Sequence, residues 1–127
     1  MRRTDQRRAA VFALYQADVT DRQAQELLER DSKPFTCELV DGVTREQEGL
    51  DVLIERHASG WSLERIAPLE RNILRVALFE LLHRPDVPDE VAIDEAVEAA
   101  KELCSAEAPS FVNGILGAIQ REEAAAR

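Results

Sequence analysis

The chain has 127 residues, 45% hydrophobic and 32% charged, enough for one domain that buries about two thirds of the surface its unfolded chain exposes. Its formal net charge of −9 excludes a protein that coats nucleic acid indiscriminately. Without an apolar run near the ~20 residues of a membrane span, and without a signal peptide, we expect a cytoplasmic protein whose two cysteines are free thiols.

Charge is distributed unevenly along the chain. Four arginines (Arg2, Arg3, Arg7 and Arg8) and one aspartate (Asp5) give the first eight residues a net charge of +3, which leaves −12 for the rest. A local basic patch can bind phosphate while the acidic remainder repels it, so we expect nucleic acid at one end only. The acidic remainder also suits a basic protein partner.

Two helices are predicted in the first thirty residues. Thr4 or Asp5 can cap a helix that runs to about Asp18, because a side-chain oxygen there accepts a hydrogen bond from a free backbone N–H. Thr20 or Asp21 can cap a short second helix in the same way. Apolar residues at helical spacing mark the buried side of both helices: Ala10, Val11, Leu14, Ala17, Ala24, Leu27 and Leu28.

A longer third helix is predicted from Pro34, since proline is tolerated in the first helical turn. Gly60 ends this helix by supplying a left-handed cap. We expect Trp61 and Leu63 to fold back onto the core, and Ser62 to cap a single helical turn.

Three further helical patterns fill Ile66–Ile119, and proline-rich joints separate them. The first, Leu69–His83, is apolar on nearly all faces and so belongs in the middle of a bundle. The second is predicted to begin near Val91–Asp94 and to end near Cys104. The third follows Pro109.

No stretch shows the alternation of a β-strand, so the sequence predicts a single all-α domain over residues 1–127. We expect about six or seven helices joined by short connections. Residues 1–8 are predicted to form a flexible arginine-rich start, and residues 121–127 a frayed tail.

Four segments of the C-terminal half resemble the NusB family of transcription antitermination factors in order and spacing: LERNILRVALFEL, the RPDVP joint, VAIDEAVEAAKEL and FVNGIL. The N-terminal RRTDQRRAAVFALYQAD is similar to the family's arginine-rich start and first helix. The resemblance implies two small crossed helical bundles that share a core. It also implies binding of a single-stranded RNA element, boxA, together with the small-subunit ribosomal protein NusE, on an elongating RNA polymerase and chiefly on ribosomal RNA operons.

The arginines at the N-terminus are the first candidates for RNA binding. Arg3 and Arg7 match family arginines when counted back from Tyr15, and their i, i+4 spacing places them on one helix face. Guanidinium groups can fork two hydrogen bonds to a phosphate or stack on a base. Arg2 and Arg8 complete the predicted basic site.

A second site is implied by the resemblance. Phe111 could stack on an exposed base, worth roughly 1–3 kcal/mol, and Glu107 and Ser110 lie in the preceding loop, which the family places near the arginine-rich end. A core phenylalanine is the equal alternative. For NusE the resemblance points to Tyr15 and Glu70, whose carboxylate would pair with a basic residue. Pairing of Glu70 within the chain is the alternative.

Two further predictions are structural. Gly114 and Gly117 lie i, i+3 and would let another helix approach closely, with Asn113 satisfying backbone groups at the crossing. Glu80 lies beside the apolar stripe of its helix and needs a partner. Arg75, or the first turn of the VAIDEAV helix, is expected to supply it.

No catalytic motif is present, and His57 and His83 lack metal-ligand spacing, so we expect a non-enzyme without metal or cofactor. Two alternatives are a detached NusB-like RNA-targeting domain of a ribosomal RNA methyltransferase, and a helical protein-binding adaptor that has lost RNA binding. Departures from the family pattern at Thr4, Asp5 and Ser110 suggest the protein-binding adaptor. Some family members pair through helical faces, so a homodimer stays possible.

Overall fold

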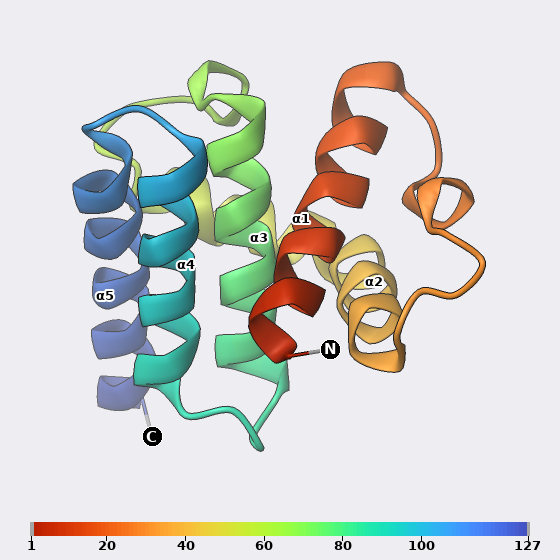
Figure 1. Ribbon diagram of the computed structural model, residues 1–127. Helices are drawn as coiled ribbons and strands as arrows, with labels where there is room; N and C mark the ends of the chain where they lie inside the picture. Colours follow the sequence, from red (N-terminus) through yellow and green to blue (C-terminus); the bar gives the residue numbers. More distant parts are fainter. Residues whose placement is uncertain (1, 127) are drawn as a thin grey trace.

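The structure, a computed structural model, describes residues 2–126, which form five α-helices and two short 3-10 helices (Figure 1). Met1 and Arg127, the ends of the predicted start and tail, lie outside the described residues. In chain order the elements are α1 (Arg3–Thr20), η1 (Ala24–Leu27), α2 (Pro34–Arg56), η2 (Leu63–Arg65), α3 (Pro68–His83), α4 (Asp89–Leu103) and α5 (Ala108–Ala126).

The prediction of an all-α fold is confirmed, but six or seven helices was too many. The predicted second helix is only the 3-10 turn η1, and the turn after Ser62 is only η2. Segments this short gain too few hydrogen bonds to offset the cost of starting an α-helix. Ala24 is the one residue of η1 that reaches the core.

Both ends of the described chain are more ordered than predicted. Helix α1 already begins at Arg3, so Arg3, Arg7 and Arg8 lie on a helix, where a flexible start was predicted. Its N-cap position is Arg2, and Thr4 instead donates a hydrogen bond to Glu95 of α4 at 2.8 Å. At the other end α5 continues to Ala126, where a frayed tail was expected.

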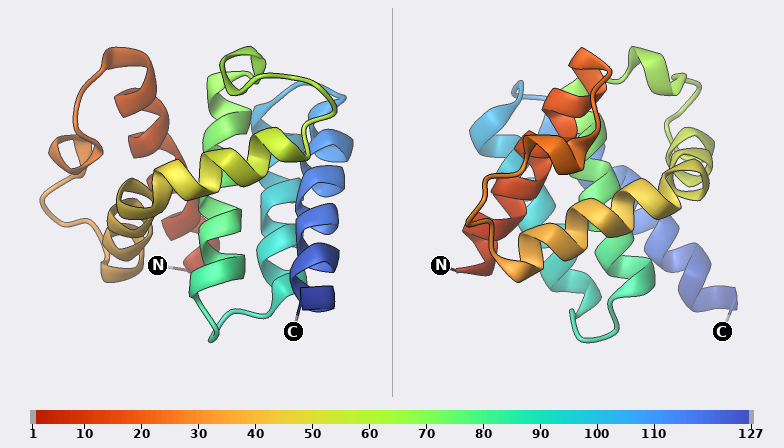
Figure 2. Two further views of the ribbon diagram at one scale, coloured as in Figure 1. Left: turned by 180° about the vertical axis from the view of Figure 1, so that it is seen from behind. Right: turned by 90° about the vertical axis from the view of Figure 1, so that its right-hand side faces the viewer.

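Helix α3 occupies the centre of the molecule, as its apolar character predicted. Ten consecutive residues, Asn72–Leu81, are buried, because α1, α2, α4 and α5 all pack against this helix. Helices α3, α4 and α5 lie side by side as one bundle, while α2 crosses α3 on the other side together with α1 (Figures 1 and 2). Burying each large side chain in this shared core contributes roughly 1.5–3 kcal/mol.

The segment between α2 and α3 differs from the prediction in two ways. Helix α2 ends at Arg56, and the left-handed conformation falls on Ser59 and Gly60, with φ of 53° and 86°. Trp61 does not fold onto the core, since 51% of it is exposed. Leu63 does pack against the core, as expected.

Close helix contact depends on a different glycine from those predicted. A methyl group added at Gly42 of α2 would overlap the ring of Phe79 in α3, so only glycine permits this crossing. Gly114 is exposed and has open space around it, and Gly117 has only the Arg121 side chain nearby. The prediction that these two glycines admit another helix was therefore wrong.

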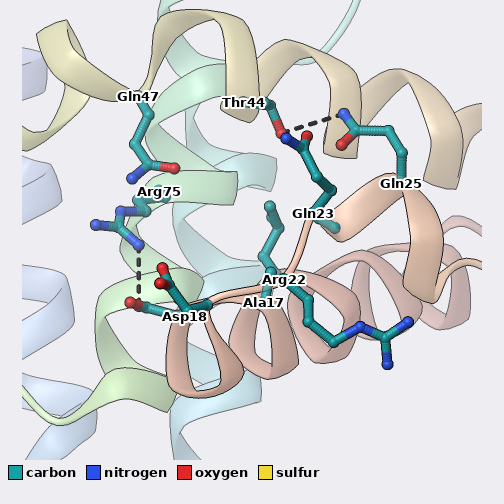
Figure 3. A pocket seen from close by; sticks show the side chains of 11 residues that line it. Ala17, Asp18, Arg22, Gln23, Gln25, Thr44, Gln47 and Arg75 are labelled. Carbon is teal, nitrogen blue, oxygen red and sulfur yellow. Dashed lines mark hydrogen bonds and ion pairs between the residues drawn. The ribbon is translucent and has the colours of Figure 1, made fainter.

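A network of charged side chains ties α1, α2 and α3 together beside a polar cleft of about 320 Å³ (Figure 3). The buried Arg75 donates to Asp18 at 3.1 Å and to Asp51 at 2.8 and 3.0 Å. Burial raises the pKa of Asp18, but hydrogen bonds from Arg71 and Asn72 and the nearby arginine charges outweigh it, so this pKa is lowered on balance. Because Arg75 and Asp18 in the cleft already pair with each other, we interpret them as stabilising the packing of α1 on α3.

Candidate nucleic-acid interface

Arg7 is the most deeply buried of the N-terminal arginines. It is 6% exposed and donates three hydrogen bonds to Glu80, at 2.8, 2.9 and 3.0 Å, with Glu95 at 3.7 Å. Glu80 therefore finds its partner in α1, and the expectation that Arg75 or the start of α4 would supply it was wrong. The burial leaves little of Arg7 at the surface, and its role in RNA binding stays a prediction.

The other three arginines reach the outside of the molecule. The side chain of Arg2 is 83% exposed, with Asp5 at 3.8 Å, and that of Arg3 is 47% exposed. Arg8 is more covered, at 14%, and pairs with Glu102 at 2.7 Å. These carboxylate partners lie at the surface, where an ion pair contributes little stability and is easily exchanged.

Three guanidinium groups surround the ring of Phe35 at the start of α2. The guanidinium carbons of Arg3, Arg7 and Arg84 lie 4.1, 5.3 and 5.2 Å from the ring centroid, within the range of cation–π attraction. We name this group the Phe35 cluster. Sequence reasoning missed Arg84, which follows the end of α3, because the RPDVP segment was interpreted only as a joint between helices.

Phe111 lies at the far end of the bundle from the Phe35 cluster. Arg3 contacts Asp86, just beyond the C-terminal end of α3, whereas Phe111 shares a cleft with Glu70 in the first turn of that helix. Figure 1 shows the same separation between the starts of α1 and α5. The expectation that the two sites are close was therefore wrong, although Arg8, paired near the end of α4, lies between them.

The cleft at Phe111 has a volume of about 220 Å³. Its lining residues are Trp61, Arg65, Ile66, Ala67, Glu70, Ser105, Glu107, Ala108 and Phe111. Phe111 is half-buried and packs partly against the core, so both of its predicted roles fit the geometry. Trp61, which sequence reasoning expected in the core, adds a second accessible aromatic ring. Ser110 is exposed and lies outside the cleft.

The candidate protein-binding residues lie at the same end. Glu70 lines the Phe111 cleft with Glu107, and burial followed by the charge of Glu107 raises the pKa of Glu70. No ion pair to either carboxylate is found within residues 2–126. Tyr15 is half-buried on α1. The Phe111 cleft is thus acidic and aromatic, which suits a cation or a nucleobase better than a phosphate.

The described part of the chain offers no group of three histidine, cysteine, aspartate or glutamate side chains arranged to hold a metal ion. Cys37 and Cys104 are both free thiols, and burial raises the pKa of Cys104 to about 11. Among residues 2–126 no helix combines the length and the apolar character needed to cross a lipid bilayer.

Residues 4–121 match the model of the NusB family. The transcription antitermination protein NusB of Frankia casuarinae is 55% identical over 85 residues, which cover 67% of this chain and 63% of that protein. The protein of the same name from Rubrobacter xylanophilus is 44% identical over 122 residues, covering 91% of this chain and 88% of that one. A crystal structure of antitermination factors NusB and NusE in complex with dsRNA matches with a TM-score of 0.84 at 28% identity, covering 94% of this chain and 96% of its own.

Proposed function

The chain belongs to the NusB family, and on that basis we propose that it is a transcription antitermination factor. It binds boxA-type single-stranded RNA together with the ribosomal protein NusE. The pair joins an elongating RNA polymerase in the cytoplasm and supports processive transcription of ribosomal RNA. The protein makes and breaks no bond, because its work is to present RNA and NusE jointly to the polymerase.

The observation that carries this proposal is the family match over residues 4–121, which covers nearly all of the chain and includes Arg8 and Phe111 of the candidate surface. The similar structure of NusB and NusE with dsRNA supports NusE and RNA as joint partners, although its RNA is double-stranded. The exposed guanidinium groups of Arg2 and Arg3 supply the positive charge that RNA phosphates require.

The proposed RNA-binding surface runs from the start of α1 to the start of α5. Arg2, Arg3 and Arg8 contact the phosphate backbone, and Phe111 stacks on a base, with Glu107 and Ser110 beside it. Arg7 is left out because its charge is neutralised inside the protein by Glu80.

NusE binds through Tyr15 and Glu70 in this proposal. Because Glu70 and Phe111 line one cleft, RNA and NusE meet there and can influence each other's affinity. By thermodynamic linkage, any factor by which NusE strengthens RNA binding is the factor by which RNA strengthens NusE binding.

One observation favours a second candidate, a protein-binding adaptor that has lost RNA binding. Each of the four N-terminal arginines has a carboxylate within 4 Å, so much of the positive charge is already compensated. This adaptor would bind NusE through Tyr15 and Glu70 but would bind no RNA.

Fluorescence anisotropy of a labelled boxA-like oligonucleotide separates the two candidates. We expect saturable binding that NusE strengthens, and weaker binding of a scrambled oligonucleotide of the same length. No detectable binding of either RNA, with NusE present and bound, would instead identify the adaptor.

A further inference from the structure

Asp86 lies between two arginines that come from different parts of the chain. Its carboxylate accepts hydrogen bonds from Nε and Nη2 of Arg84, at 2.9 and 3.0 Å, and it lies 3.5 Å from Nη2 of Arg3. Arg84 is held on its other side by Glu38, to which Nη1 donates at 2.8 Å. One aspartate thus bridges two guanidinium groups at the surface.

The Phe35 cluster fixes the positions of these two guanidinium groups. Phe35 is only 5% exposed, and Arg3 and Arg84 both pack on its ring. The third cation of the cluster, Arg7, is buried and paired with Glu80. The arrangement therefore holds two guanidinium groups ready for one anion, and it would persist if Asp86 moved away.

A carboxylate and a phosphodiester offer similar hydrogen-bond acceptors to this site. Each presents two anionic oxygens that the Nε and Nη2 edge of an arginine can bind in parallel. The Asp86 side chain is 48% exposed and lies in the short connection between α3 and α4, so it can leave without disturbing the core. Hydrogen bonds from Arg84 hold the pKa of Asp86 down to about 2, so it remains an anion at any ordinary pH.

We propose that Arg3 and Arg84 form a phosphate-binding site for RNA, and that Asp86 occupies this site in the free protein. An RNA phosphodiester replaces the Asp86 carboxylate, while Glu38 keeps Arg84 in position. This inference rests on the proposed function, and it adds to it one binding residue, Arg84, and one internal competitor, Asp86.

The exchange is feasible because the Asp86 side chain is half exposed, so an RNA phosphate can reach the guanidinium groups as the carboxylate leaves. A phosphate contact also releases counterions from the RNA, which favours binding at low salt. Asp86 thus weakens RNA binding without preventing it, and the protein binds RNA less tightly than its arginines alone would allow.

Replacing Asp86 by asparagine tests the competition. Asp86→Asn removes the anion but nearly preserves the shape, so we expect affinity for a boxA-like oligonucleotide to rise about three- to tenfold. The control is Glu48→Gln on α2, which changes the net charge equally at an exposed position far from the cluster. Its effect should stay below about twofold, because salt screens distant charges.

Arg84→Gln tests the site itself. Losing one phosphate contact should reduce the slope of log affinity against log salt by about 0.7. On the Arg84→Gln background, Asp86→Asn should then give a smaller gain than in the unaltered protein, because only Arg3 remains to pair with Asp86. Circular dichroism verifies that each variant is folded, and the comparison of Asp86→Asn with Glu48→Gln stands even if Arg84→Gln does not fold.

The outcomes separate this inference from the function on which it rests. If the unaltered protein binds boxA-like RNA but Asp86→Asn and Glu48→Gln behave alike, the inference is overturned and the function stands. A gain from Asp86→Asn that persists undiminished without Arg84 also overturns it, since Asp86 would then not compete for Arg84. If the unaltered protein binds no RNA, the proposed function fails first.

Discussion

Arg7 and Glu80 connect α1 to α3 through three hydrogen bonds, although 73 positions separate them in the chain. Both side chains are buried, with 6% and 1% exposed. A buried ion pair offsets its loss of hydration only while both partners are present. The Arg7–Glu80 pair therefore fixes how α1 packs on α3. Each of the two buried charges is stable only while the other is present.

Removing one partner of this pair should be far more costly than removing both. Glu80→Leu removes all three hydrogen bonds and leaves the buried Arg7 charge with only Glu95, at 3.7 Å, so we expect the free energy of unfolding to fall by about 3–5 kcal/mol. The double variant Arg7→Met, Glu80→Leu should recover most of that loss. Urea denaturation of the single and double variants measures the coupling, and simple additivity of the two single effects would contradict it.

Charge reversal at the start of α1 should weaken RNA binding. Arg2→Glu with Arg3→Glu replaces two exposed cations by anions, and we expect at least about a tenfold loss of affinity for a boxA-like oligonucleotide at low salt. The matched control is Arg22→Glu with Arg45→Glu, which reverses two exposed arginines elsewhere. Equal losses in both double variants would mean that only net charge matters.

Phe111→Leu should distinguish the two roles of this side chain. If its ring stacks on a base, RNA affinity falls by a factor that corresponds to roughly 1–3 kcal/mol. Stability should change by less than about 1.5 kcal/mol, because leucine preserves most of the buried apolar volume. The opposite pattern, with RNA binding intact and a lower thermal midpoint, would make Phe111 a core residue alone.

Two glycines of α2 should respond to alanine in opposite directions. Gly42→Ala forces a methyl group against Phe79, so we expect a loss of about 1–3 kcal/mol in the free energy of unfolding. Gly49→Ala meets open space on an exposed helical position and should gain about 0.5–1 kcal/mol. Chemical denaturation of both variants checks this contrast, and destabilisation by Gly49→Ala would refute it.

Glu70→Gln should raise stability at neutral pH while weakening NusE binding. The folded-state pKa of Glu70 lies above its usual value, because of burial and of Glu107, so its ionised form costs stability above that pKa. The gain from glutamine should stay below about 1 kcal/mol, given solvent screening. It should disappear as the pH falls through the pKa and Glu70 takes up its proton. If the stability gained by Glu70→Gln were constant from pH 3 to about pH 7, the raised pKa of Glu70 could not be its cause.

The sequence was most informative where local pattern decides structure. Apolar residues on every face of Leu69–His83 predicted a central helix, and α3 is buried continuously over Asn72–Leu81. Proline also marked the start of α2 at Pro34 and the end of α3 before Pro85, whereas Gly60 lies beyond the end of α2 at Arg56. The length of the short helices was the least predictable feature. A four-residue 3-10 helix with one buried alanine shows the same capping residues and apolar spacing as a short α-helix.

The candidate site was less predictable, because its geometry depends on contacts distant in sequence. Nothing near Arg7 indicates that Glu80 will neutralise it, and nothing near Arg84 indicates that Phe35 will hold it beside Arg3. The i, i+4 spacing correctly placed Arg3 and Arg7 on one helix face. Which of them faces solvent is decided by where α3 lies, and periodicity does not contain that information.

The cation–π contact of Arg3 with Phe35 has a consequence for how this end of the protein discriminates among RNAs. The guanidinium carbon of Arg3 lies 4.1 Å from the ring centroid, and the side chain is 47% exposed, so a nucleobase stacked on its exposed part would form a sandwich with Phe35. Such a sandwich accepts purines and pyrimidines alike, since every base has a π-face. Recognition of the RNA sequence must then depend on other residues, while Arg3 contributes affinity for any single strand.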